Sequence, residues 1–138
     1  MKKTTSVADT SCNPRHDPDT RLLVADNVRP MLRELEKKVM WLSAWMIHGA
    51  NHLRPERDGL KVGGHQASCA SVVTLMTALY FHALRPLDRV AVKPHASPVF
   101  HAIQYLLGRQ DKENMALFRG FGGAQSYPSR TKDTDDVD

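Results

Sequence analysis

Apolar side chains recur every three or four positions in two stretches of the chain, which is the spacing of one face of an α-helix. The first stripe consists of Leu32, Leu35, Val39, Leu42 and Met46. It predicts a helix from the capping residue Asn27 to about Leu53. The second stripe consists of Val72, Leu75, Met76, Leu79 and Ala83. It predicts a helix from about Ser68 to Leu84 that buries these side chains, and Pro86 prevents it from continuing.

Two shorter patterns follow the second helix. Residues 89–93 alternate in polarity and include two valines, which predicts a strand. A turn leads from there into a third helix over residues 98–107, which begins at a proline and is ended by Gly108. A short fourth helix is predicted over residues 111–120, with an aspartate at its cap and a glycine at its end.

The expected fold class is α/β. A single strand leaves the backbone N–H and C=O groups along its edges without hydrogen-bond partners. In a parallel α/β domain the further strands are supplied by later βα units. The sequence therefore predicts the opening segment of an α/β domain, rich in helix, over residues 25–138. Residues 1–24 are rich in Thr, Asp and Pro and contain few large apolar side chains, so we expect them to form a flexible arm.

Composition and charge exclude several classes of protein. The 138 residues are 41% hydrophobic and 25% charged, which is typical of a globular domain. No apolar run approaches the roughly 18 residues needed to cross a bilayer, and no signal peptide is recognisable, so no membrane partner is expected. Two cysteines cannot form a disulfide framework, which favours the reducing cytoplasm. Residues 31–110 carry ten basic and five acidic side chains, but they lack the dense clustering and the motifs of a nucleic-acid-binding protein.

Seven histidines are the most distinctive candidates for chemistry. His48 and His52 lie four positions apart on the first helix, a spacing that can hold a metal ion, but the residues between them include no general-base glutamate. We interpret both as surface side chains near the carboxyl end of the helix, which attracts positive charge. His82 is expected to pack, and His101 either packs or points into a ligand cleft. His16 lies in the arm.

His65 and His95 differ from the others because each lies at a change of chain direction. His65 follows two glycines and precedes the second helix, whereas His95 follows the expected strand and precedes the third helix. The carboxyl ends of strands and the amino ends of helices are where α/β folds bind ligands, phosphates above all. Both histidines are therefore candidate site residues. The alternative is that they only contact backbone carbonyl groups of their loops.

The surroundings of these two histidines resemble a known family. Residues 61–68, Lys-Val-Gly-Gly-His-Gln-Ala-Ser, resemble the first histidine segment of the thiamine-diphosphate-dependent transketolase superfamily. Residues 88–98, which end in Lys-Pro-His-Ala-Ser-Pro, resemble its second segment, a strand that ends in a histidine. Residues 106–109, 118–119 and 126–128 continue the match in register.

Within the superfamily, the first segment is similar to that of the homodimeric first component of the pyruvate dehydrogenase complex, where Gly-Gly-His is followed by one residue and then Ala-Ser. Transketolase proper usually has Gly-His-Pro-Gly there. In the second segment, Pro94 replaces the usual glycine before the histidine. The family's Gly-Asp-Gly motif for diphosphate and metal is not present in this sequence. The resemblance therefore implies the amino-terminal portion of a cofactor-binding domain, inactive by itself and without metal ligands of its own.

The resemblance implies a three-layer α/β/α domain that binds thiamine diphosphate with magnesium and acts on a small molecule, either a ketose phosphate or a 2-oxo acid. His65 and His95 would line the cleft as both cofactor-binding and catalytic residues, donating hydrogen bonds and moving protons. A second copy of the chain or a complementing subunit would complete the site. Two other interpretations stay open: a non-catalytic binding or assembly module, and a protein that binds metal or phosphate through its histidines.

Overall fold

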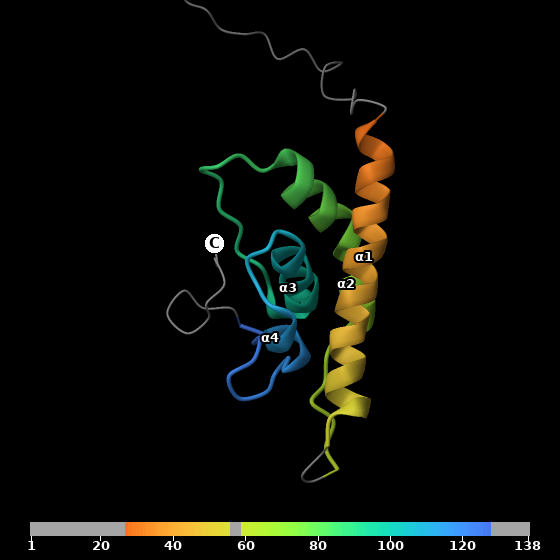
Figure 1. Cartoon of the computed structure of the whole chain (residues 1–138), viewed down its shortest axis with the longest axis vertical. Helices are drawn as coiled ribbons and strands as arrows, with labels where there is room; N and C mark the ends of the chain where they lie inside the picture. The colour runs from red at the N-terminus through yellow and green to blue at the C-terminus, as the bar shows by residue number, and fades with distance from the viewer. Residues whose placement is uncertain (1–26, 56–58, 128–138) are drawn as a thin grey trace, which may run out of the picture.

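The computed structural model describes residues 27–55 and 59–127, and Figure 1 shows how their helices are arranged. The α-helices are α1 (Val28–His48), α2 (Gln66–Ala78), α3 (Ser97–Leu106) and α4 (Lys112–Ala116). Single turns of π-helix, η2 (Gly49–Leu53) and η3 (Leu79–Ala83), extend α1 and α2, and a 3₁₀ turn, η4 (Pro94–Ala96), leads directly into α3. The arm predicted for residues 1–24 lies outside the described residues.

The first predicted helix is confirmed, because α1 and η2 together cover residues 28–53. Its apolar stripe faces the rest of the protein: Val39 and Met46 are buried, and the three leucines of the stripe are half-buried. Both α2 and α3 pack against this face, and Figure 1 shows α1 passing alongside them. The regular spacing of the stripe was sufficient to identify the buried side of this helix.

The second helix has the predicted extent but a different buried face. Leu75 is 67% exposed and Ala83 is exposed, whereas Cys69, Val73 and Met76 are buried. The prediction of the buried face is therefore wrong in part. The reason is that α2 has apolar residues on several sides, so more than one face satisfies the helical spacing. Packing against α1 and α3 selects between these faces, and the sequence of α2 alone does not.

The strand predicted for residues 89–93 is wrong. The segment approaches η4 in an extended conformation, with Lys93 at φ −67° and ψ 146°, but it pairs with no other strand in the described part of the chain. Alternation and β-branched residues favour an extended backbone, yet a strand also needs a neighbour with which to exchange hydrogen bonds. All regular secondary structure in residues 27–55 and 59–127 is therefore helical, and the three-layer α/β/α arrangement is not seen in them.

The third and fourth predicted helices are present. The bounds of α3 differ from the prediction by one residue at each end, and Gly108 follows it with φ of 73°, as expected of a glycine that ends a helix. α4 is shorter than predicted and gives way to turns after Ala116. Asp111 caps it as expected, because its carboxylate accepts a hydrogen bond from the Asn114 N–H at 2.6 Å.

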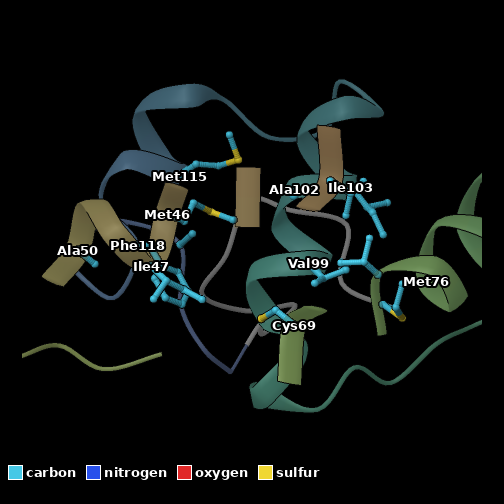
Figure 2. Close-up of a cluster of buried hydrophobic side chains, with 13 residues drawn as sticks. Met46, Ile47, Ala50, Cys69, Met76, Val99, Ala102, Ile103, Met115 and Phe118 are labelled. Carbon is cyan, nitrogen blue, oxygen red and sulfur yellow. The ribbon is translucent and has the colours of Figure 1, made fainter. Parts of the chain in front are cut away.

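The core is built around α3, whose residues 97–104 are all buried. Val99 and Ile103 of this helix pack in one cluster with Met46 of α1 and Met76 of α2, as Figure 2 shows. Phe118, from the turn after α4, closes the cluster and is fully buried. None of the helices in the described ranges is both long and apolar enough to cross a membrane.

Candidate functional site

The imidazole rings of His65 and His95 lie together, with centroids 4.7 Å apart and planes inclined by 57°. His65 is the residue directly before α2, and His95 is the middle residue of η4, which runs into α3. The amino ends of α2 and α3 therefore meet, and each carries one histidine. Both side chains are exposed to solvent. The structure thus brings together the two candidate residues that the sequence placed on separate loops.

The position of the pair favours an anion. At the start of a helix the first N–H groups have no acceptor within the helix, and the helix dipole adds partial positive charge. In α3 the Ser97 N–H already donates to Pro94 O, Pro98 has no N–H, and the backbone of Val99 bonds to Cys69. The start of α2, with two imidazoles beside it that can donate hydrogen bonds, therefore suits a phosphate or a carboxylate group. The turn that carries His95 is fixed by two bonds: the Ala96 N–H donates to Lys93 O, and Ser97 Oγ donates to Pro94 O, both at 2.9 Å.

Two glycines give the loop before His65 its path. Gly63 has φ of 81° and Gly64 has φ of 137°, in the region that residues with side chains rarely adopt. The space around them is also closed, because a Cβ on Gly64 would lie 2.9 Å from the side chain of Ile47 and one on Gly63 would lie 2.9 Å from Arg119. Glycine at both positions lets the chain pass against α1 and still turn into α2 at His65.

Asn51, in η2, fastens this loop to the end of α1. Its Nδ2 donates to Ile47 O at 2.7 Å and to Gly63 O at 2.9 Å, and its Oδ1 accepts from the Gly63 N–H at 2.8 Å. Asn51 is only 7% exposed, so these bonds form largely away from water. π-Helical turns are frequent at functional positions, and here the turn carries the residue that holds the His65 loop.

Arg119 holds the same loop from the turn after α4. Its backbone has φ of 58°, which is unusual for a residue other than glycine. Its Nη1 donates to Val62 O at 2.8 Å, its Nε donates to Ser126 Oγ, and its guanidinium lies 5.4 Å from the centroid of the Phe118 ring. These contacts offset the backbone strain and join the loop before His65 to the segment after α4.

Cys69 lies in the first turn of α2 and connects it to η4. Its Sγ donates to the carbonyl oxygen of His95 at 3.4 Å. Burial raises the pKa of the Cys69 thiol to about 11, although a backbone hydrogen bond at Val99 and the charge of Arg119 act in the opposite direction. Because the thiolate is the reactive form, this thiol is expected to hold the two helix ends together rather than to act as a nucleophile.

His101 packs in the core and does not reach the histidine pair. Its Nε2 lies 2.7 Å from the carbonyl oxygen of Gln125, and its Nδ1 lies 3.1 Å from Nε2 of Gln110. A carbonyl oxygen only accepts, so Nε2 of His101 donates to it. The ring also meets Phe100 and Phe118 edge to face. Of the two expectations for this residue, packing is therefore the one that holds.

The other histidines lie apart from the pair. His48 and His52 are exposed at the end of α1, with ring centroids 4.9 Å apart. The expectation that His82 packs is wrong, because it is exposed in η3, where no residue is fully buried. His16 lies outside the described residues. In the described part of the chain, no three side chains of His, Cys, Asp or Glu gather where they could hold a metal ion.

Sequence reasoning identified the pair but missed the residues that position it. Asn51 follows Ile47 by four positions, on the buried face of α1, and a polar side chain in such a place needs partners. That signal was available. Arg119 lies in a segment that carries the family resemblance, but nothing in the sequence indicates its contact with Val62. Cys69 looks like any small residue on a helix, because its bond to His95 depends on how α2 and α3 meet.

Comparison with known proteins gives partial matches of moderate identity. The chain is 34% identical, over 101 residues, to the pyruvate dehydrogenase E1 components of Mycolicibacterium smegmatis and Mycobacterium tuberculosis, a match that covers 65% of this chain. It is 30% identical over 110 residues, 69% of this chain, to the corresponding protein of Corynebacterium glutamicum. The chain spans about a tenth of the length of these relatives. No family model matches it, and no solved structure gives a significant match. The expected resemblance to the first component of pyruvate dehydrogenase is thus confirmed over about two thirds of the chain.

Proposed function

We propose that this chain forms the histidine-bearing part of a thiamine-diphosphate-dependent enzyme that acts on a 2-oxo acid, with His65 and His95 facing the reacting molecules. The observation that carries the proposal is the contact between the two imidazole rings, 4.7 Å apart where the amino ends of α2 and α3 meet. The similarity to pyruvate dehydrogenase E1 components supports a 2-oxo acid rather than a ketose phosphate as the substrate.

The chemistry of the pair fits the group that it would hold. Thiamine diphosphate, when bound, supplies a nucleophilic carbon for addition to a carbonyl group. The N–H groups of His65 and His95 and the amino end of α2 are donors suited to a diphosphate or a substrate carboxylate. An imidazole can both give and take a proton, so each ring can also donate a proton to a developing oxyanion or accept one from a hydroxyl.

The described residues supply these donors, but among them no three side chains of His, Cys, Asp or Glu gather where they could hold a metal ion. The magnesium that accompanies a diphosphate prefers oxygen ligands such as carboxylates, which the histidine pair does not provide. We therefore expect this chain by itself to bind thiamine diphosphate weakly or not at all. Titration calorimetry with magnesium present measures this directly, and a micromolar dissociation constant would contradict the expectation.

We further propose that the working form contains a second copy of the chain or a complementing subunit, in the cytoplasm. Leu75 and Leu87 are 67% and 89% exposed, and apolar side chains of this size favour association when they form part of an uncovered surface. Sedimentation velocity of the purified chain should show association that increases with concentration. A single monomer at all concentrations would exclude self-association and leave only a different subunit as the partner.

The proposed function is tested in a chimera of the Mycolicibacterium smegmatis E1 component in which the matching segment is replaced by that of this chain. The assay is pyruvate-dependent reduction of an artificial electron acceptor. His65→Ala and His95→Ala should each lower turnover by about 10²- to 10⁴-fold, the usual effect of removing a positioned proton-transfer group. His48→Ala and His82→Ala are matched controls, because both remove an exposed imidazole away from the pair, and they should leave turnover nearly unchanged.

Circular dichroism of each variant separates loss of function from loss of folding. If all four variants behave alike, or if His48 is the residue on which turnover depends, the assignment of the site is wrong. In that case the non-catalytic interpretation, a binding or assembly module that keeps this arrangement of helices, becomes the better account of the chain.

A further inference from the structure

An apolar groove lies between one side of α1, the carboxyl end of α3 and α4. It consists of two adjoining hollows of about 320 and 350 Å³, and Trp41, Leu42 and Tyr105 line both of them. Hollows of this size are at the lower end of what small-molecule sites enclose. The groove is separate from the histidine pair. His95 precedes the amino end of α3, and this helix of 10 residues is about 15 Å long.

The floor of the groove is fixed by the core. Met115 is buried, and Leu42, Trp45 and Tyr105 are half-buried and pack against the core cluster. Trp41 stands at the edge of the groove and is 64% exposed. Its ring is nearly parallel to that of Trp45, with planes inclined by 13° and centroids 6.3 Å apart. The groove therefore offers two aromatic rings in fixed orientations, one of them largely uncovered, and exposed apolar surface of this kind is typical of a binding groove.

The polar side-chain groups around the first hollow, the one that Met115 lines, are hydrogen-bond donors. The indole N–H groups of Trp41 and Trp45 and the ammonium group of Lys112 only donate, and the hydroxyl of Tyr105 can donate as well. Within residues 27–55 and 59–127, none of these four side chains makes a hydrogen bond to another residue. A set of donors with free hydrogens suits a ligand group that only accepts, and a carboxylate is such a group.

The charges at the groove favour a single negative charge on the ligand. Lys112 is the cation at the first hollow, and the carboxylates on either side of it in the chain, Asp111 and Glu113, are exposed and line neither hollow. At the second hollow one glutamate accepts a hydrogen bond from a lysine at 2.6 Å, and a further lysine is present: Glu34, Lys37 and Lys38. Exposed charges that do not touch the ligand are screened by salt. The donors in contact with the ligand, Lys112 above all, therefore decide which group is bound.

We propose that this groove binds a small aromatic molecule that carries one carboxylate. The carboxylate lies in the first hollow, where Lys112 and Tyr105 donate to it, and a hydrogen bond between charged groups is stronger than one between neutral groups. The aromatic part lies against the ring of Trp41 and extends over Leu42 and Leu106 into the second hollow. Neither imidazole of the histidine pair takes part, so the groove binds its ligand whether or not the proposed function is correct.

Binding in the groove can be observed directly, because Trp41 and Trp45 are the two tryptophans of the chain. The test is a titration of the full chain with phenylbutyrate, phenylbutanol and acetate, followed by tryptophan fluorescence and by calorimetry. Phenylbutyrate should change the fluorescence and bind at submillimolar concentration. It should bind at least about fivefold more tightly than phenylbutanol, which shares its apolar part but lacks the carboxylate. Acetate lacks the apolar part and should bind at least about tenfold more weakly than phenylbutyrate.

Substitutions locate the two parts of the ligand. Lys112→Gln should weaken the binding of phenylbutyrate by about fivefold or more and change that of phenylbutanol by less than about twofold, because only the carboxylate uses the ammonium group. Trp41→Ala should weaken the binding of both ligands by about fivefold or more. Lys61→Gln removes an exposed lysine that lines neither hollow. It is the matched control and should change binding by less than about twofold. Circular dichroism checks that each variant is folded.

Four results would overturn the proposal. Tryptophan fluorescence that does not respond to millimolar phenylbutyrate would show that the groove is not a binding site. Equal binding of phenylbutyrate and phenylbutanol would mean that the donors do not select a carboxylate. Equal weakening by Lys61→Gln and Lys112→Gln would mean that the ligand responds to positive charge in general. Fluorescence that changes with protein concentration, together with loss of phenylbutyrate binding as the chain associates, would mean that a second copy covers the groove.

Discussion

Asn51 and Gly63 are joined by two hydrogen bonds: the Gly63 N–H donates to Asn51 Oδ1 at 2.8 Å, and Asn51 Nδ2 donates back to Gly63 O at 2.9 Å. Through them the loop that ends in His65 is held against the end of α1. The same Nδ2 also donates to Ile47 O, one turn earlier in the helix. The position of His65 therefore depends on a side chain that no ligand needs to touch.

Asn51→Ala removes all three of these bonds and leaves the Gly63 backbone groups without their side-chain partner. A buried polar group that loses its partner costs about 1–3 kcal/mol, so we expect a loss of about 2 kcal/mol in the free energy of unfolding, measured by urea denaturation. His52→Ala, at the exposed neighbouring position, should change it by less than about 0.5 kcal/mol. Equal effects of the two substitutions would show that the Asn51 bonds do not stabilise the fold.

Gly64→Ala should destabilise the fold more than the same substitution at a glycine in open space. Both Gly64 and Gly122 have positive φ, but a Cβ on Gly64 would meet Ile47 at 2.9 Å, whereas nothing lies within 4 Å of one on Gly122. We expect Gly122→Ala to lower the free energy of unfolding by about 1 kcal/mol because of backbone strain. Gly64→Ala should lower it by at least about 1 kcal/mol more, because its Cβ also overpacks against Ile47. Thermal denaturation of the two variants makes the comparison, and similar melting temperatures would contradict the close packing of the loop on α1.

Cys69 should make stability depend on alkaline pH. Burial raises the pKa of its thiol from 9.0 to about 11. Above pH 9 the unfolded chain loses this proton while the folded chain keeps it, so the contribution of the thiol to stability is complete below pH 9 and is lost between pH 9 and 11.

The measurement compares urea unfolding of a Cys12→Ser variant with that of the same variant carrying Cys69→Ala. The difference in unfolding free energy between them should shrink by about 2 kcal/mol from pH 8 to pH 10.5. Lysines and tyrosines titrate equally in both proteins, so their effects cancel. A difference that does not vary with pH would mean that the Cys69 thiol is not desolvated in the fold.

The sequence predicted the long helices better than the way in which they meet. The stripe from Leu32 to Met46 identified α1 and its buried side, because the apolar residues of that helix lie mainly on one face. In α2 the same reasoning chose Leu75, which is exposed, because the orientation of a helix that is apolar on several sides is decided by its neighbours. The strand predicted at residues 89–93 failed for a related reason, since local alternation does not reveal whether a pairing partner is present.

The candidate site was predictable only in part. His65 and His95 could be selected because the glycines before a turn and the residues that begin a helix can be recognised in the sequence. Their contact, and the bonds of Asn51 and Arg119 that fix the His65 loop, depend on residues far apart in the chain. Such contacts follow from the packing of α1, α2 and α3 and have no local pattern of their own.

The claim that His65 and His95 serve one site is tested most directly by a double-mutant cycle in the E1 chimera. The values of kcat/KM for pyruvate are compared for the unsubstituted chimera, His65→Ala, His95→Ala and the double variant. The effects of groups that act on the same reacting molecule are not additive. The kcat/KM of the double variant should therefore lie within about threefold of that of the less active single variant. Single variants with unchanged kcat/KM, or losses that simply multiply in the double variant, would contradict a shared site.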